Sequence, residues 1–148
     1  MNPNIKLEEK LAILATLDPA SAAASTVVTA WVPTAGFHSF MALIQTGVLG
    51  AAATLDAKLR QATDASGTGA KDISGKAITQ IVKASGDNKQ ALIECRGTDL
   101  DGINGFAYVA LSLTVGTAAS IVGASLIGGN PYMSPCSGSN QAAVVQVV

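Results

Sequence analysis

The stretch Phe106–Ile127, with the sequence FAYVALSLTVGTAASIVGASLI, contains no charged residue and is long enough to span a membrane as a helix. Ser, Thr and Gly recur along it, however, and neither Lys nor Arg flanks it as an interfacial anchor. Every second position from Val109 to Val115 is aliphatic, which is the period of a β-strand with one buried face. We therefore predict two strands joined by a turn at Gly116-Thr117, and no membrane-spanning helix.

The composition is that of one folded domain with an unusually low charge. The chain has 148 residues, of which 49% are hydrophobic and 13% are charged, and its net charge is −1. Such a chain can close a hydrophobic core, but it offers no general electrostatic attraction for nucleic acid. The charges are also unevenly placed, because none follows Asp101. Sheet edges usually carry charges that prevent unwanted pairing, so this last third is expected to be covered by the fold or by a partner.

The period of two recurs along most of the chain, with clusters of turn residues between the segments. In Thr54–Gln61, for example, aliphatic residues alternate with charged ones. The segments predicted as strands are Val27–Val32, Phe37–Gln45, Thr54–Gln61, Ala77–Lys83, Gln90–Arg96, Phe106–Val115, Ser120–Ile127 and Ala142–Val147. The one predicted helix is short and lies within Ile5–Leu14. About eight short strands without intervening helices predict an all-β fold, a single β-sandwich or jelly roll.

The N-terminal part differs in composition from the rest. Residues 1–25 are rich in small side chains and are predicted to form an N-terminal arm or linker, with residues 26–148 forming the β-sandwich domain. Three aliphatic residues in this arm are placed to dock on this chain or on a neighbour. Leu7, Leu11 and Leu14 are therefore the candidate protein-interface residues.

Several short patterns suggest chemistry but lack the residues that the chemistry needs. His38 is the only histidine, so no His pair can hold a metal, and it is expected as a neutral ring packed on the sheet. Gly69–Lys76 resembles a phosphate-binding loop, but its glycines are wrongly spaced and a hairpin loop is predicted instead. Asp99 and Asp101 lack the further oxygen ligands of a calcium loop. We predict no catalytic residue, no cofactor and no metal site, and hence no enzyme.

Cys95 and Cys136 fit no metal motif, and two thiols in a chain of this length favour free cysteines, with a single disulfide left open. Glu8 and Glu9 lie where a secretory signal would carry positive charge. We therefore expect a protein that is not exported by such a signal.

Four segments carry a resemblance to a known family: TLDAKLRQATDASGTGAKDI at Thr54–Ile73, GKAITQ at Gly75–Gln80, FAYV at Phe106–Val109 and TVGT at Thr114–Thr117. In these segments the sequence resembles small head proteins of tailed bacteriophages, the jelly-roll cement or decoration proteins that attach to the outside of the capsid shell. The resemblance spans roughly Leu7 to Tyr132.

The resemblance implies a β-sandwich that clamps neighbouring major capsid proteins. Its partners would be the major capsid protein and other copies of itself, as a dimer by preference or a trimer, with neither nucleic acid nor membrane involved. It would be made in the host cytoplasm and reside on the capsid exterior of the virion. The family supplies no catalytic residue and no fixed binding motif to carry over.

Three alternatives remain open at this stage. A carbohydrate-binding or adhesin-like β-sandwich would present an exposed platform of aromatic side chains, although aromatic residues make up only 4% of the chain. An integral membrane protein would be helical and depend on detergent. An enzyme on a jelly roll would have to work with a single histidine.

Overall fold

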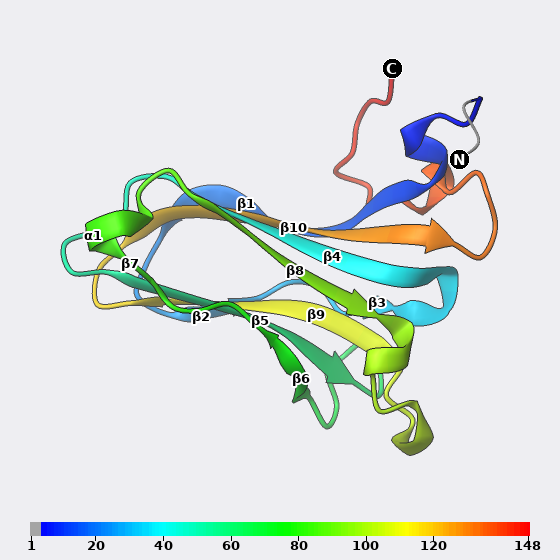
Figure 1. Ribbon diagram of the computed structural model, residues 1–148, viewed down its shortest axis with the longest axis horizontal. Coiled ribbons are helices and arrows are strands. Elements are labelled where there is room, and N and C mark those ends of the chain that lie inside the picture. The colour runs from blue at the N-terminus through cyan, green and yellow to red at the C-terminus, as the bar shows by residue number, and fades with distance from the viewer. Residues whose placement is uncertain (1–3) are drawn as a thin grey trace.

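In the computed structural model, which describes residues 4–148, two antiparallel sheets pack face to face (Figure 1). Sheet A contains, in spatial order, β1 (Leu11–Ala22), β10 (Ser120–Pro131), β4 (Phe37–Thr46) and β8 (Gln90–Arg96). Sheet B has the order β2 (Thr26–Val28), β9 (Tyr108–Gly116), β5 (Thr54–Ala62) and β6 (Lys71–Ala77). Two-residue strands extend it, with β3 (Val32–Pro33) paired to β9 and β7 (Ile81–Val82) paired to β5. Helical structure is limited to α1 (Lys83–Gly86) and 3-10 turns at Leu7–Glu9, Thr34–Gly36, Gly97–Asp99, Gly102–Asn104 and Ser137–Ser139.

The strand pairings are nested along the chain. β1 pairs with β10, β2 with β9, β4 with β8, and β5 with β6. Each of these pairs lies, along the chain, inside the one before it. Eight main strands in this order form a jelly roll. The predicted all-β sandwich of about eight strands is therefore confirmed.

The core lies between the sheets and is built from alternate residues of the strands. On β5, Leu55, Ala57 and Leu59 are buried, as the period of two predicted. On β9 the buried set includes the predicted face from Val109 to Val115, and Ala110 and Ser112 on the opposite face are buried as well. The two strands predicted in Phe106–Ile127 are present, because this segment contains β9 and most of β10. No helix between residues 4 and 148 is long and apolar enough to cross a membrane.

The prediction of an arm over residues 1–25 is wrong for most of its length. Leu11–Ala22 forms β1, which pairs with β10 along sheet A, and only the turn at Leu7–Glu9 remains of the helix expected within Ile5–Leu14. Two register shifts, between Ile13 and Ala15 and between Leu17 and Ala20, interrupt the period of two and hide the strand. Residues 1–3 of the expected arm lie outside the described residues.

Two further strand predictions are wrong. Ala77–Lys83 was expected as one strand, but it contains only the last residue of β6 and the two-residue strand β7, and most of β6 lies in the segment expected as a hairpin loop. Gly75 in β6 has a positive φ of 72°, and the ladder with β5 shifts register there, so the pattern is broken. Ala142–Val147 forms no strand and pairs with no sheet edge of its own chain.

A truncation in the core tests this packing. Leu59→Ala should destabilise the fold by about 2–5 kcal/mol, because the fully buried side chain leaves a cavity between the sheets. Leu92→Ala is the matched control: this leucine on β8 is 58% exposed and should cost less than about 1 kcal/mol. Urea unfolding followed by circular dichroism measures both, and equal losses for the two variants would contradict the described core.

Candidate protein-binding surface

The outer face of sheet B has the chemistry of a solvated surface. Asp56, Lys58 and Arg60 point outward from β5, between the buried residues. The carboxylate of Asp72 on β6 accepts hydrogen bonds from Lys58 Nζ at 2.7 Å and Arg60 Nε at 3.1 Å. These ion pairs lie across neighbouring strands, as charged residues on a water-facing sheet commonly do.

The outer face of sheet A is different, because it carries apolar and uncharged polar residues and is nearly free of charge. The strand register identifies the outward positions as those that alternate with the buried ones. The outward apolar residues are Leu11, Ile13, Met41, Leu43, Leu92, Ile121 and Ile127. Outside the irregular stretch of β1 at Asp18-Pro19, the only outward charges on the four strands are Glu94 and Arg96 of β8. The two outer faces of the sandwich therefore differ in charge, with most of the outward charges on sheet B.

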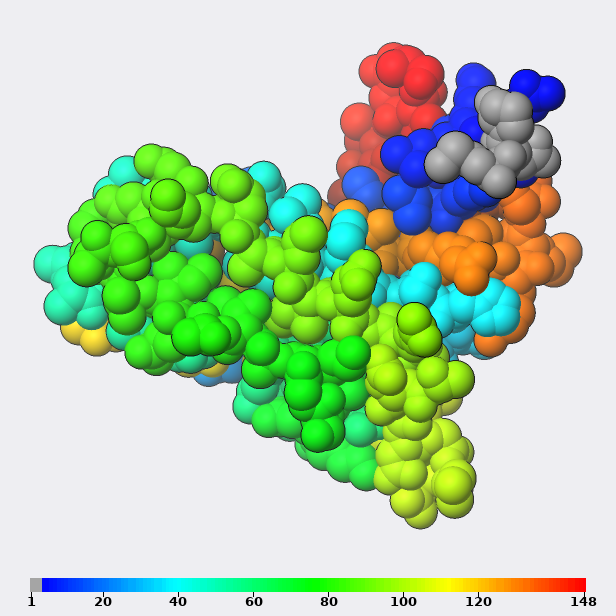
Figure 2. All heavy atoms as spheres, viewed as in Figure 1, coloured from blue at the N-terminus to red at the C-terminus, as the bar shows by residue number. Residues whose placement is uncertain are grey.

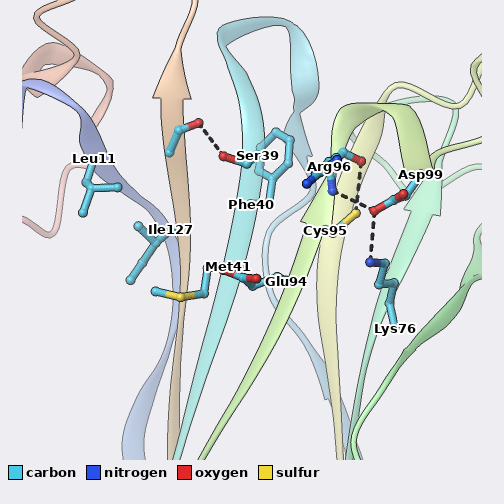
Figure 3. A pocket seen from close by; sticks show the side chains of 11 residues that line it. Leu11, Ser39, Phe40, Met41, Lys76, Glu94, Cys95, Arg96, Asp99 and Ile127 are labelled. Atoms are coloured by element: carbon cyan, nitrogen blue, oxygen red, sulfur yellow. Dashed lines mark hydrogen bonds and ion pairs between the residues drawn. The ribbon is translucent and has the colours of Figure 1, made fainter. Parts of the chain in front are cut away.

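A hollow of about 570 Å³ lies over this face, and we call it the sheet A groove (Figure 3). Part of the bottom of the groove is formed by Ser39 and Gly129, which have a small side chain and none. The Ser39 hydroxyl donates a hydrogen bond to the Gly129 carbonyl at 3.1 Å. Met41 and Ile127, which are bulkier, occupy the next outward positions, two residues away on the same strands. The β8 side of the groove is lined by further residues, Lys76, Glu94, Cys95, Arg96 and Asp99.

Both ends of the described chain gather beside the β1 edge of sheet A (Figures 1 and 2). The Ile13 backbone is held by the C-terminal segment, since its N–H donates to Asn140 Oδ1 at 2.8 Å and its carbonyl accepts the Gln141 N–H at 2.8 Å. The Glu9 carbonyl accepts the Cys136 N–H at 3.2 Å and the Ser134 hydroxyl at 3.0 Å. We call residues 4–11, 130–134 and 141–148 together the terminal surface.

The predicted interface residues divide between this surface and the core. Leu7 is 71% exposed and, with Leu11, lines an apolar hollow of about 370 Å³ in the terminal surface. The hollow is completed by Ile5, Lys10, Asn130, Pro131 and Ser134. Leu14 instead packs against the core, close to Gly128. Only Leu7 and Leu11 are therefore available to a partner.

Sequence reasoning missed other exposed apolar residues of the terminal surface. Met133 is 83% exposed and Val145 is 92% exposed, and Val147 and Val148 are also exposed. Val145 and Val147 were expected inside a strand, where one face would have been buried. The available signal was the absence of charge after Asp101, which is unusual for a segment that faces water.

The residues first considered for chemistry have structural partners. The carboxylate of Asp99 accepts the Arg96 N–H at 2.9 Å and lies 3.0 Å from Lys76 Nζ, and these contacts hold the pKa of Asp99 below its usual value. The carboxylate of Asp101 pairs with Lys71 and accepts two hydrogen bonds from the Asn104 amide, which likewise lowers its pKa. Within residues 4–148 no group of three or more His, Cys, Asp and Glu could hold a metal ion.

His38 is not packed on the sheet as expected. It is exposed at the start of β4, and its ring lies against that of Tyr132, with 3.8 Å between the ring centres. The neighbour of His38 is thus the exposed Tyr132 ring, and none of the ion pairs among the described residues includes His38.

The aromatic side chains are dispersed over the molecule. Phe37 and Phe40 are buried and meet edge to face, with ring centres 6.4 Å apart. The ammonium of Lys71 lies 4.1 Å from the centre of the Phe106 ring, and Trp31 packs against Gly67. Trp31 and Phe106 both lie beside the loop at Gly67–Gly69, and both are partly buried, whereas the carbohydrate-binding alternative requires a platform of exposed rings.

Cys95 and Cys136 are both free and buried. Burial raises the pKa of the Cys95 thiol to about 11, and the negative charge of Asp99 adds to the effect. Burial also raises the pKa of Cys136. Since the thiolate is the nucleophile, neither group is prepared for nucleophilic chemistry at neutral pH.

Comparison with known proteins gives likeness of shape alone. The chain matches no family model and none of the curated proteins. It is similar in fold to a chain of the Triatoma virus empty capsid, with a TM-score of 0.47 and 9% identity over 86% of this chain and 94% of that one. A chain of Broad Bean Stain Virus gives a TM-score of 0.45 and 9% identity over 91% and 94%. A carbohydrate-binding module solved with β-1,4-galactotriose gives 0.36 and 11% over 70% and 65%. At these scores the likeness carries no assignment of function.

The anchor of the C-terminal segment can be tested by hydrogen exchange. Asn140→Ala removes the side chain that accepts the Ile13 N–H, and a lost hydrogen bond of about 1 kcal/mol should speed exchange at the Ile13 amide about fivefold. Asn104→Ala, which removes a side-chain bond in a distant loop, is the control and should leave Ile13 unchanged. An unaltered Ile13 amide in Asn140→Ala would contradict the described anchor.

The buried thiols give a second test. With a pKa of about 11, about a thousandth of Cys95 is thiolate at pH 8, so native protein should react with iodoacetamide far more slowly than protein unfolded in urea. Mass spectrometry of the modified peptides measures the difference. Rapid modification of Cys95 in native protein would show that β8 does not hold this thiol inside the sandwich.

Proposed function

We propose that the protein is a structural virion protein, a cement protein that binds the outside of a phage capsid and stabilises contacts between major capsid proteins. The observation that carries the proposal is the terminal surface, which presents exposed apolar side chains from both ends of the described chain and an apolar hollow beside Leu7. The resemblance of the sequence to phage cement proteins supports the same function.

The terminal surface has properties that suit attachment to a protein shell. Leu7, Met133 and Val145 gain nothing for folding from their exposed positions, but each would contribute free energy if it were buried against a partner. Beside Leu7 lies a hollow of about 370 Å³ that can receive a side chain from the shell. Buried anchors in fitted hollows supply most of the free energy of typical protein interfaces.

Repetition strengthens such a contact. A standard interface buries about 800 Å² per partner, and a smaller apolar contact gives only modest affinity. Many copies on one shell that each bridge neighbouring subunits would still stabilise it together, because every bridge adds to the cost of separating those subunits. In this proposal the partner is the major capsid protein and the location is the capsid exterior, after synthesis in the host cytoplasm.

The test is binding to capsids that lack the protein. Purified protein and capsids are mixed and sedimented, and the pellet is imaged by cryo-electron microscopy. Symmetry-ordered density outside the shell at a fixed ratio of copies is the expected result. A soluble protein that does not sediment with capsids would overturn the proposal.

A single substitution tests the surface. Leu7→Glu puts a charge beside the hollow and should weaken capsid binding at least tenfold, while leaving folding intact because the side chain is exposed. Val48→Glu is the matched control, since Val48 is also an exposed aliphatic residue but lies in the loop after β4. Equal binding by both variants would rule out the terminal surface as the contact.

A further inference from the structure

We propose that residues 144–148, which we call the valine segment, bind the capsid as a β-strand added to an open sheet edge of the major capsid protein. This contact rests on the proposed function, since its partner is the capsid shell. It specifies the chemistry of attachment, in which backbone hydrogen bonds supply affinity and alternate side chains supply specificity.

The valine segment has the composition of a strand but lies in none. Four of its five residues are valine, a β-branched residue that favours strands over helices. It contains no charge and no proline, the two features that usually keep an exposed strand from pairing with another chain. Within residues 4–148 it forms neither helix nor strand, and Val145 is 92% exposed there.

The backbone of the valine segment is unpaired beyond its first residue. The Val144 N–H donates to the Gln141 carbonyl at 3.0 Å. No hydrogen bond within the described part of the chain includes a backbone group of residues 145–148. Their N–H and carbonyl groups are therefore open to a partner.

The nearest sheet edge of its own chain does not take the segment. Asn140 and Gln141 pair with the outer edge of β1 at Ile13, but the register of β1 shifts between Ile13 and Ala15, directly beyond this contact. The turn from Gln141 to Val144 then directs the chain away from the sandwich (Figure 1). The valine segment thus starts from a fixed point on β1 and projects outward.

The unpaired backbone determines which kind of surface can receive the segment. In an apolar groove the valine side chains would be buried, but the N–H and carbonyl groups would lose water without gaining hydrogen bonds. A helix would pair some of these groups internally, yet five residues rich in valine are too few to hold one. A sheet edge satisfies the backbone and covers the side chains together.

The order of side chains fits an edge strand with one drier face. In a strand Val145 and Val147 point to one side, and Gln146 points to the other between Val144 and Val148. Five residues span about 17 Å, the length of an ordinary strand. We therefore assign Val145 and Val147 to the face that packs on the capsid protein, and the face with Gln146 to the side nearer water.

Hydrogen exchange on decorated capsids tests for the strand. In unbound protein the amides of residues 145–148 should exchange as fast as those of an unfolded chain. In an edge strand every second amide points to the partner, so alternate amides should slow at least about a hundredfold on the capsid. The amides of α1, at the opposite end of the molecule in Figure 1, are the control and should be unchanged.

Proline substitutions separate backbone pairing from burial of side chains. Proline has no N–H, and of two neighbouring residues in a strand only one directs its N–H to a given partner. Of Gln146→Pro and Val147→Pro, one should weaken capsid binding at least about tenfold and the other much less. Gln146→Thr is the matched control, because it keeps the N–H and the strand preference and should bind like the wild type. All three variants should unfold at the wild-type temperature, since the segment belongs to no sheet of its own chain.

The contrary results distinguish this contact from the proposed function. Wild-type protein that binds capsids while residues 145–148 exchange as in unbound protein overturns the strand contact and leaves the proposed function standing. Capsid binding that is unchanged in both proline variants does the same. Protection of the segment in purified protein at ~100 µM, without capsids, would assign it to another copy of this chain and also overturn the proposal. Wild-type protein that does not sediment with capsids overturns the proposed function and the strand contact together.

Discussion

The pairing of β1 with β10 is the contact on which the rest of the structure depends. It joins the first and last strands of the described chain, and β10 in turn pairs with β4, so sheet A cannot close until segments about a hundred residues apart have met. The other pairings are nested inside this one. Close approach is also required across the pair: a Cβ on Gly123 would lie 3.1 Å from Pro19, and a Cβ on Gly128 would lie 2.8 Å from the Leu14 side chain. Glycine at these positions lets β1, with its two register shifts, follow β10 along its length.

This closure also determines where the surfaces lie. Because the outermost strands are neighbours, both ends of the chain leave the sandwich beside the edge of β1, where Asn140 and Gln141 hold the Ile13 backbone. The terminal surface is thus a consequence of nested pairing. Since the segment after Asp101 carries no charge, β10 contributes only apolar and small residues to the outer face of sheet A. Charges are concentrated on β5 and β6 instead, so the two outer faces of the sandwich differ in charge.

The sequence predicted the fold where alternation is regular and failed where the backbone is not. Phe37–Gln45, Thr54–Gln61 and Gln90–Arg96 lie within one residue of β4, β5 and β8, because every second residue there enters the core. β1 was hidden by its register shifts and β6 by Gly75, features that depend on the neighbouring strand. Val144 to Val148 have the composition of a strand, but a strand also needs a free edge to pair with, and propensity does not reveal one. Of the binding surface, Leu7 and Leu11 were identified from the sequence. The sheet A groove could not be identified in this way. Gly129 and Arg96 both lie beside Ser39, and these positions depend on the register between strands that are distant in the chain.

Attachment to a capsid through the terminal surface would cover that surface with protein and leave the outer face of sheet B in water. Hydroxyl-radical footprinting of the protein on decorated capsids, compared with dilute protein in solution, tests it most directly. The expected result is strong protection of Leu7 and Met133 on the capsid, with unchanged labelling of peptides that contain the outward residues of β6. Protection of β6 with continued labelling of Leu7 and Met133 would contradict attachment through the terminal surface.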